Sequence, residues 1–303
     1  MSNYLFNNHI NVARNFKEEG NTLKALKFYK KAYNIEGHRK DIELLLDMAL
    51  LYHELEQMDL AEEKYREVLE IDKEEERAFY GLGILYDDDG FYDEAKEYYE
   101  KAINLNNNYD KAYFFLANIY DEEGNKEKAI QLYKKVLDIN PKDLWANANI
   151  ACIMEELFRL DEAKYYNKKA LEIDSNHFRI LFNMGVIEKR LGNIDEAKTY
   201  YEKSINRNPK YSFSHLNLGV IYREKGEFNK AIDVITKGIE ENNDEAFLYY
   251  NRACFYALIG DKELALNDII KATEMDGFFI EYMKKDEELD IIRDLTLYEE
   301  KFL

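Results

Sequence analysis

Four asparagines recur along the chain at intervals of 34 residues, namely Asn149, Asn183, Asn217 and Asn251. Each is followed two positions later by a glycine or an alanine. A side-chain amide carries hydrogen-bond donors and an acceptor, so it can pair with both the C=O and the N–H groups of an extended peptide, whatever the sequence of that peptide. The spacing indicates that the four amides occupy the same position in successive structural repeats.

A recurring alanine marks the same repeat over most of the chain. It recurs every 34 residues at Ala61, Ala95, Ala129, Ala163, Ala197, Ala231 and Ala265, and Ala25 lies 36 residues before the first of these. If this alanine is position 20 of a 34-residue unit, position 8 is glycine or alanine in all eight units and position 15 is glycine in six. Position 24 is mostly aromatic. Self-similarity at such a period indicates an array of stacked repeats.

The spacing of apolar positions predicts two helices in each unit. Positions 4, 7, 8 and 11 form one helical stripe, and positions 20, 24 and 27 form a second. Glycine at position 15 suits a left-handed residue that ends the first helix. A single hairpin of this kind cannot bury its apolar stripe, so neighbouring units must stack. The predicted fold class is therefore all-α.

This pattern resembles that of tetratricopeptide repeat (TPR) proteins. Pro141 and Pro209 also fall at position 32, where the family prefers proline. The resemblance implies a TPR α-solenoid, a right-handed superhelix of helical hairpins. Its eight units are 6–39, 42–75, 76–109, 110–143, 144–177, 178–211, 212–245 and 246–279.

The two ends and the middle of the array differ from the repeat pattern. Residues 1–5 are expected to form an N-terminal lead-in, and residues 280–303 to form capping helices over the apolar face of the eighth unit. In the fifth unit Asn167 stands where an aromatic residue is usual, and in the sixth Glu188 replaces a tyrosine. These departures predict looser packing or a local change in curvature.

Composition restricts the classes of partner. The net charge is −19, with 34% charged and 46% hydrophobic residues. Such a surface repels nucleic acid and anionic lipid and attracts basic segments. The first residues show no signal peptide, and the absence of 18 consecutive apolar residues predicts no membrane span. Two cysteines provide no disulfide framework. We therefore expect a cytoplasmic protein.

The resemblance also implies where a partner binds. In TPR proteins positions 2, 5, 6, 9 and 12 of the first helix face a concave groove, and the four asparagines stand at position 6. Packed helices lie about 8–10 Å apart and an extended chain advances about 3.3 Å per residue, so each amide serves about three peptide residues. This ladder resembles the groove of the O-GlcNAc transferase TPR region and of bacterial TPR receptors for signalling peptides. The alternative is that asparagine is simply frequent at this position.

Apolar and basic side chains surround the predicted ladder. Aromatic residues beside polar anchors supply much of the energy of protein interfaces, and Trp145 is the best candidate hot spot. The alternative is that these rings pack against the next repeat. Arg179 and Arg223 could meet acidic side chains or a terminal carboxylate. The expected binding residues besides the asparagines are Trp145, Phe182, Phe213, Leu216, Phe247, Tyr250, Arg179 and Arg223.

Other kinds of site are not expected from the sequence. The five histidines and two cysteines lack metal-binding spacing, and no phosphate-binding loop, nucleophile elbow or catalytic triad is present, so we expect no metal, no cofactor and no catalytic residue. The carboxylate clamp of TPR proteins that bind chaperone tails requires matching residues in three consecutive units. No three units match, and the closest fragments, Arg77 and Asn183, lack their partners, so binding of Hsp70 or Hsp90 is not expected.

The sequence therefore favours a non-enzymatic scaffold that holds an extended protein or peptide segment, of unknown identity, in the groove. Two alternatives remain open. One is a structural scaffold that uses its convex or terminal surfaces and self-associates, so an oligomer is possible. The other is a peptide-sensing regulator like the bacterial TPR receptors, without a DNA-binding domain of its own.

Overall fold

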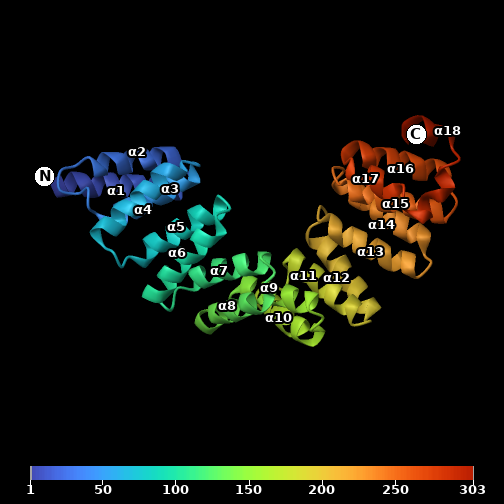
Figure 1. The fold of residues 1–303 in the computed structure, drawn as a ribbon, viewed down its shortest axis with the longest axis horizontal. Helices are drawn as coiled ribbons and strands as arrows, with labels where there is room; N and C mark the ends of the chain where they lie inside the picture. Colours follow the sequence, from blue (N-terminus) through green and yellow to red (C-terminus); the bar gives the residue numbers. More distant parts are fainter. Residues whose placement is uncertain (1, 303) are drawn as a thin grey trace. The chain divides into compact units, whose positions relative to one another are not determined.

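The computed structural model describes residues 2–302, which form helices and no strands. The helices form successive pairs, each pair a helical hairpin, and the hairpins follow one another along the chain (Figure 1). The predicted all-α repeat fold is confirmed. The pairs are α1 (Ser2–Glu18) and α2 (Thr22–Tyr33), α3 (Ile42–Glu54) and α4 (Met58–Ile71), α5 (Glu76–Asp88) and α6 (Tyr92–Leu105), α7 (Asp110–Glu122) and α8 (Lys126–Ile139), α9 (Leu144–Glu156) and α10 (Leu160–Ile173), α11 (Phe178–Arg190) and α12 (Ile194–Arg207), α13 (Ser212–Glu224) and α14 (Phe228–Glu241), and α15 (Ala246–Leu258) and α16 (Lys262–Met275).

The chain divides into two compact units, residues 1–146 and 147–303. In both units the core lies between the two helices of each hairpin and between successive hairpins. All eight repeat alanines are fully buried, because their small side chains let the paired helices approach closely. The tyrosines at position 24 fill the space beside them, and Tyr29, Tyr99, Tyr133 and Tyr201 are completely buried.

Glycine ends the first helix of six hairpins with a left-handed residue. Its φ lies between 71° and 84° at Gly20, Gly90, Gly124, Gly192, Gly226 and Gly260. Glu56 and Phe158 take the same position in the other two hairpins with φ of 56° and 58°. The hairpin geometry therefore requires this conformation even where a side chain makes it unfavourable.

Residues 2–5 belong to α1 rather than to a separate lead-in, which departs from the prediction, while Met1 lies outside the described residues. The first turn of the helix is held by contacts with the loop that follows α2. The ring of Phe6 stacks on His38 with centroids 3.9 Å apart, and the His38 Nε2 lies 3.1 Å from the Asn3 Oδ1. These contacts stabilise helix through the start of the chain.

After the eighth hairpin the chain forms α17 (Phe278–Met283), the 3₁₀ helix η1 (Glu287–Ile292) and α18 (Thr296–Phe302). This stretch packs on the last hairpin, and α17 begins at Phe278, before the expected start of the capping helices at residue 280. Met283, Leu289 and Ile292 are buried in the same apolar core as the side chains of α15 and α16. We refer to residues 283–292 as the C-terminal segment.

The two polar departures from the repeat are well packed rather than loose. Asn167 is fully buried, and its Nδ2 donates a 3.0 Å hydrogen bond to the Ile180 carbonyl of the next repeat. Glu188 is also buried and forms an ion pair of 2.8 Å with Lys164, while Asn193 donates to its other oxygen at 2.8 Å. Polar contacts thus stand where the other repeats have aromatic packing, although the Asn167 Oδ1 is buried without a hydrogen-bond partner among the described residues.

Candidate functional site

Two asparagines of the predicted ladder are oriented by their own helices. The Asn217 Nδ2 donates to the Phe213 carbonyl at 3.0 Å, and the Asn251 Nδ2 donates to the Phe247 carbonyl at 2.8 Å. Both side chains are half-buried. Within residues 2–302 no hydrogen bond to the Oδ1 of either amide is formed, so each retains an acceptor and a second N–H for a ligand.

Asn183 is held differently, by the preceding repeat. Its Nδ2 donates to the Cys152 Sγ at 3.2 Å, which joins α11 to α9. Cys152, Phe182 and Asn183 line a hollow of about 180 Å³ together with Glu155. Asn149, one repeat earlier on α9, is half-buried. The four asparagines therefore share a position in the repeat but not one hydrogen-bonding pattern.

Three of the predicted aromatic residues form a row across consecutive repeats. The Phe213 ring lies 6.4 Å from Phe182 and stacks on Phe247 at 5.2 Å with an interplanar angle of 16°. Phe213 is 48% exposed, while Phe182 and Phe247 are half-buried. The structure therefore brings these rings onto the face formed by the first helices α11, α13 and α15, which we call the first-helix face.

Sequence reasoning missed Tyr211, which completes this row. Its ring lies 5.3 Å from Phe182 and 5.7 Å from Phe213. Tyr211 stands at the last position of its repeat, in the turn before α13. Tyr109 occupies the same position three repeats earlier and contacts Tyr80 at 5.0 Å, so a recurring aromatic at the repeat junction was the available signal.

Tyr250 and Arg223, predicted to meet a ligand, are instead bound by the C-terminal segment. Tyr250 is only 4% exposed, and its ring stacks on Phe279 at 4.9 Å. Its hydroxyl donates a 2.6 Å hydrogen bond to Asp286, and Arg223 forms an ion pair with Glu288. The segment is drawn over these residues because its own apolar side chains are buried in the core of the last hairpin.

A hollow of about 570 Å³ remains beside the segment, with Arg223, Asn251 and Cys254 on one side and Asp286 and Glu288 on the other. Burial raises the pKa of the Cys254 thiol, and the carboxylates of Asp286 and Glu288 raise it further. A thiol in this environment stays protonated and is a poor nucleophile. Thiolate chemistry is therefore disfavoured in this hollow.

The remaining predicted residues are distributed differently. Leu216 is half-buried and packs against the core of the last repeats. Arg179 is exposed, with its guanidinium 5.7 Å from the centre of the Phe178 ring. Trp145 is 42% exposed and belongs to the first compact unit, whereas the aromatic row belongs to the second.

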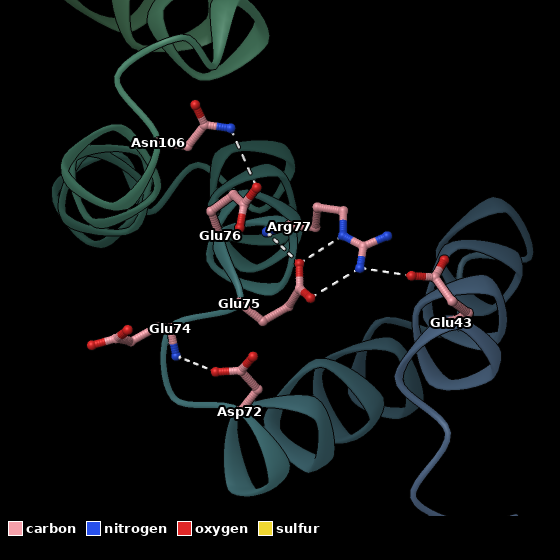
Figure 2. Close-up of polar contacts among 7 residues, drawn as sticks. All are labelled: Glu43, Asp72, Glu74, Glu75, Glu76, Arg77 and Asn106. Carbon is pink, nitrogen blue, oxygen red and sulfur yellow. Dashed lines mark hydrogen bonds and ion pairs between the residues drawn. The ribbon is translucent and has the colours of Figure 1, made fainter.

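Arg77, the closest fragment of a carboxylate clamp, is enclosed by carboxylates of its own chain (Figure 2). Its Nε and Nη2 donate to the two oxygens of Glu75 at 2.6 and 2.9 Å. Nη2 also lies 2.7 Å from Glu43, which stands at the same position of the preceding repeat. The charge of Arg77 is therefore neutralised by two carboxylates before any ligand arrives.

The part of the chain from 2 to 302 contains no group of three or more histidine, cysteine, aspartate or glutamate side chains arranged to hold a metal ion. Cys152 and Cys254 are free thiols. Among the same residues, no helix combines the length and the apolar character needed to cross a lipid bilayer.

Comparison with known families is consistent with the repeat read from the sequence. Tetratricopeptide repeat profiles match residues 42–75, 88–149, 178–211, 200–233 and 248–278, which together make up more than half of the chain. A Sel1 repeat profile also matches residues 17–34 and 235–254. The chain belongs to the tetratricopeptide repeat proteins. No curated protein matches it in sequence.

Solved structures of TPR proteins share the fold at low sequence identity. A chain of the APC/C Cut9–Hcn1 hetero-tetramer is 16% identical with a TM-score of 0.60, and the match covers 90% of this chain and 52% of that chain. The present chain thus spans about half the length of that relative. PilF of Pseudomonas aeruginosa is 18% identical with a TM-score of 0.61, covering 74% and 98% of the two chains. YrrB, described as a TPR protein with an unusual peptide-binding site, is 23% identical with a TM-score of 0.52, covering 61% and 95%.

Proposed function

We propose that this TPR protein is a non-enzymatic scaffold that holds an extended segment of a partner protein on the first-helix face of its second compact unit. The observation that carries the proposal is the pairing of ring and amide in successive repeats. Asn217 is bonded to the carbonyl of Phe213, and Asn251 to the carbonyl of Phe247, while the two rings stack on each other.

This arrangement divides recognition between two kinds of group. The half-exposed Phe213 and its neighbours Phe182 and Phe247 supply apolar contact area, which dominates the energy of protein interfaces. The amides supply backbone hydrogen bonds that do not depend on the partner's side chains. Because helices pack about 8–10 Å apart, one ring and one amide serve about three residues of an extended segment.

The comparisons support the same class of function. TPR repeats are found in proteins that bind other proteins, and YrrB is described as carrying a peptide-binding site. For the present chain, the binding of an extended segment on the first-helix face rests on the geometry of its own asparagines and rings.

The test is selection of binding peptides from a random peptide library on the wild-type protein, followed by affinity measurement with the double variant Asn183→Ala/Asn217→Ala. We expect the variant to bind the selected peptides at least about fivefold more weakly, because two amides that bond the peptide backbone contribute about 0.5–1.5 kcal/mol each. The matched control is Asn206→Ala/Asn229→Ala, two exposed asparagines on the second helices α12 and α14.

Equal affinities of the wild-type protein and the Asn183→Ala/Asn217→Ala variant would contradict the proposal, provided that circular dichroism shows the same helix content. Loss of binding in the control pair would place the partner on the second helices instead. A sedimentation experiment on the free protein distinguishes a self-associating scaffold, which forms a concentration-dependent oligomer unaffected by either pair of changes.

A further inference from the structure

A second hollow, of about 370 Å³, lies in the first compact unit and is unrelated to the asparagines. It is formed where α5, α7 and α8 meet the start of α9. Its lining combines aromatic rings with carboxylates. The rings are those of Tyr80, Phe114, Phe115 and Trp145, and the carboxylates are those of Asp110 and Asp143.

The rings of this hollow are not simply stacked together. Phe114 and Phe115 meet nearly at right angles, with an interplanar angle of 81° and centroids 5.7 Å apart. Tyr80 is tilted by 57° to Phe115 at 6.1 Å, and Trp145 is 42% exposed. An aromatic face carries the negative end of the ring quadrupole, so a cation that enters among these rings is attracted by the faces it contacts.

The net charge around the hollow is negative, like the partial charge on an aromatic ring face. Asp110 and Asp143 contribute two carboxylates, against one ammonium group from Lys111. The surrounding repeats add to this field, since residues 41–123 contain 25 aspartates and glutamates and only seven lysines and arginines. A concave site lined by one sign of charge attracts the opposite sign.

We propose that this hollow binds a basic side chain of a partner, in which a guanidinium or ammonium group on an apolar stem enters among the rings. The stem contacts the aromatic walls, and the cation lies against the ring faces within reach of Asp110. This combination of aromatic faces and carboxylates is complementary to a cation and not to an anion. The site is separate from the first-helix face proposed above, because it lies in the other compact unit.

Trp145 makes the proposal directly measurable, because it is the only tryptophan of the sequence. Its fluorescence, excited selectively beyond the tyrosine band, is titrated with N-butylguanidinium chloride and with N-butylurea, its uncharged analogue of similar shape. Sodium chloride at equal concentration controls for ionic strength. We expect a saturable change with the guanidinium compound and a roughly 3- to 10-fold weaker affinity for the urea.

Charge changes at the edge provide the matched variants. Asp110→Asn retains an oxygen to accept the Lys111 backbone N–H, now 2.8 Å from the Asp110 carboxylate, and is expected to weaken guanidinium binding several-fold. Lys111→Gln is expected to strengthen it. The control is Asp138→Asn, which removes the same charge from a 68% exposed side chain that does not line the hollow and is expected to have no effect.

Equal responses to butylguanidinium and butylurea would show that the hollow accepts apolar groups without regard to charge and would overturn the proposal. So would the absence of any saturable response, or shifts of the same sign for Asp110→Asn and Lys111→Gln. The result is independent of the peptide test, since Asn183→Ala/Asn217→Ala leaves the Trp145 response unchanged if the two sites are distinct.

Discussion

The hydroxyl group of Tyr250 donates a 2.6 Å hydrogen bond to Asp286, 36 residues further along the chain. With the ion pair between Arg223 and Glu288, this contact fixes the C-terminal segment to the first helices of the last two repeats. The predicted ladder therefore ends in a region that the protein covers with its own acidic segment. Asn251 lines the hollow that remains there.

The reactivity of the Cys254 thiol measures how readily the C-terminal segment moves away from the last repeat. It is 6% exposed, its Sγ lies 3.8 Å from Asp286, and burial together with the nearby carboxylates raises its pKa. Asp286→Ala removes both the bond to Tyr250 and a negative charge beside the thiol. We expect Cys254 to react several-fold faster with a disulfide reagent in this variant, measured in a Cys152→Ser background.

The control for that measurement is Glu287→Ala in the same segment, because the Glu287 side chain is exposed and forms no hydrogen bond or ion pair with the other residues from 2 to 302. Its thiol reaction is expected to match that of the parent protein. An unchanged rate in Asp286→Ala would mean that the buried Met283, Leu289 and Ile292 hold the segment without help from its polar contacts.

From the backbone conformation of Glu56 we predict that a substitution by glycine stabilises the protein. Its φ of 56° is a left-handed conformation, which glycine provides in six other hairpins. Glu56→Gly is expected to raise the free energy of unfolding by about 0.5–1 kcal/mol, because relief of backbone strain exceeds the added entropy of the unfolded chain. Chemical denaturation measures it. Glu56→Ala removes the same charge but keeps a Cβ, so the gain should be absent; equal effects of the two changes would point to charge instead of strain.

The environment of the Asp87 carboxyl group is expected to make the stability of the protein depend on pH. Burial raises the pKa of its carboxyl group, and the neighbouring Asp88 and Glu122 raise it further, although the 3.0 Å hydrogen bond from Tyr99 opposes the shift. An acid with a raised pKa in the folded state costs stability as the pH rises from its unfolded pKa, about 3.9, through the folded value. The charged form is therefore unfavourable in the folded protein at neutral pH.

Asp87→Asn keeps an oxygen for the Tyr99 hydroxyl and removes this charge. We expect a melting temperature higher by on the order of 2 °C at neutral pH, with the difference vanishing below about pH 3.9. Thermal unfolding followed by circular dichroism at several pH values measures it. Asp89→Asn, at an exposed position in the same acidic run, is the control. A difference that persisted at low pH would exclude ionisation of Asp87 as its cause.

Local spacing was enough to predict the hairpins and the shared position of the asparagines. The alanine at position 20 is buried in every repeat because the same residue meets the same neighbours each time, and a pattern of this kind is visible in one sequence. Phe182 stands at position 5 of its repeat and Phe213 and Phe247 at position 2, so the contact of Phe182 with Phe213 is seen only in the structure. The burial of Asn167 and Glu188 could not be predicted, because Asn167 bonds to Ile180 and Glu188 pairs with Lys164, residues of adjacent repeats at separations that do not recur.

The sequence by itself determined the repeat length, the helical hairpins and the shared repeat position of the four asparagines, since these depend on contacts that recur at fixed separations. Only the tertiary structure decided which of the predicted binding residues are contacted by other parts of the chain. Tyr250 and Arg223 are bound by Asp286 and Glu288, residues outside the repeat that reach them through the path of a non-repeating segment. That path is set by the burial of its apolar side chains against the last hairpin, a long-range contact that no periodic pattern encodes.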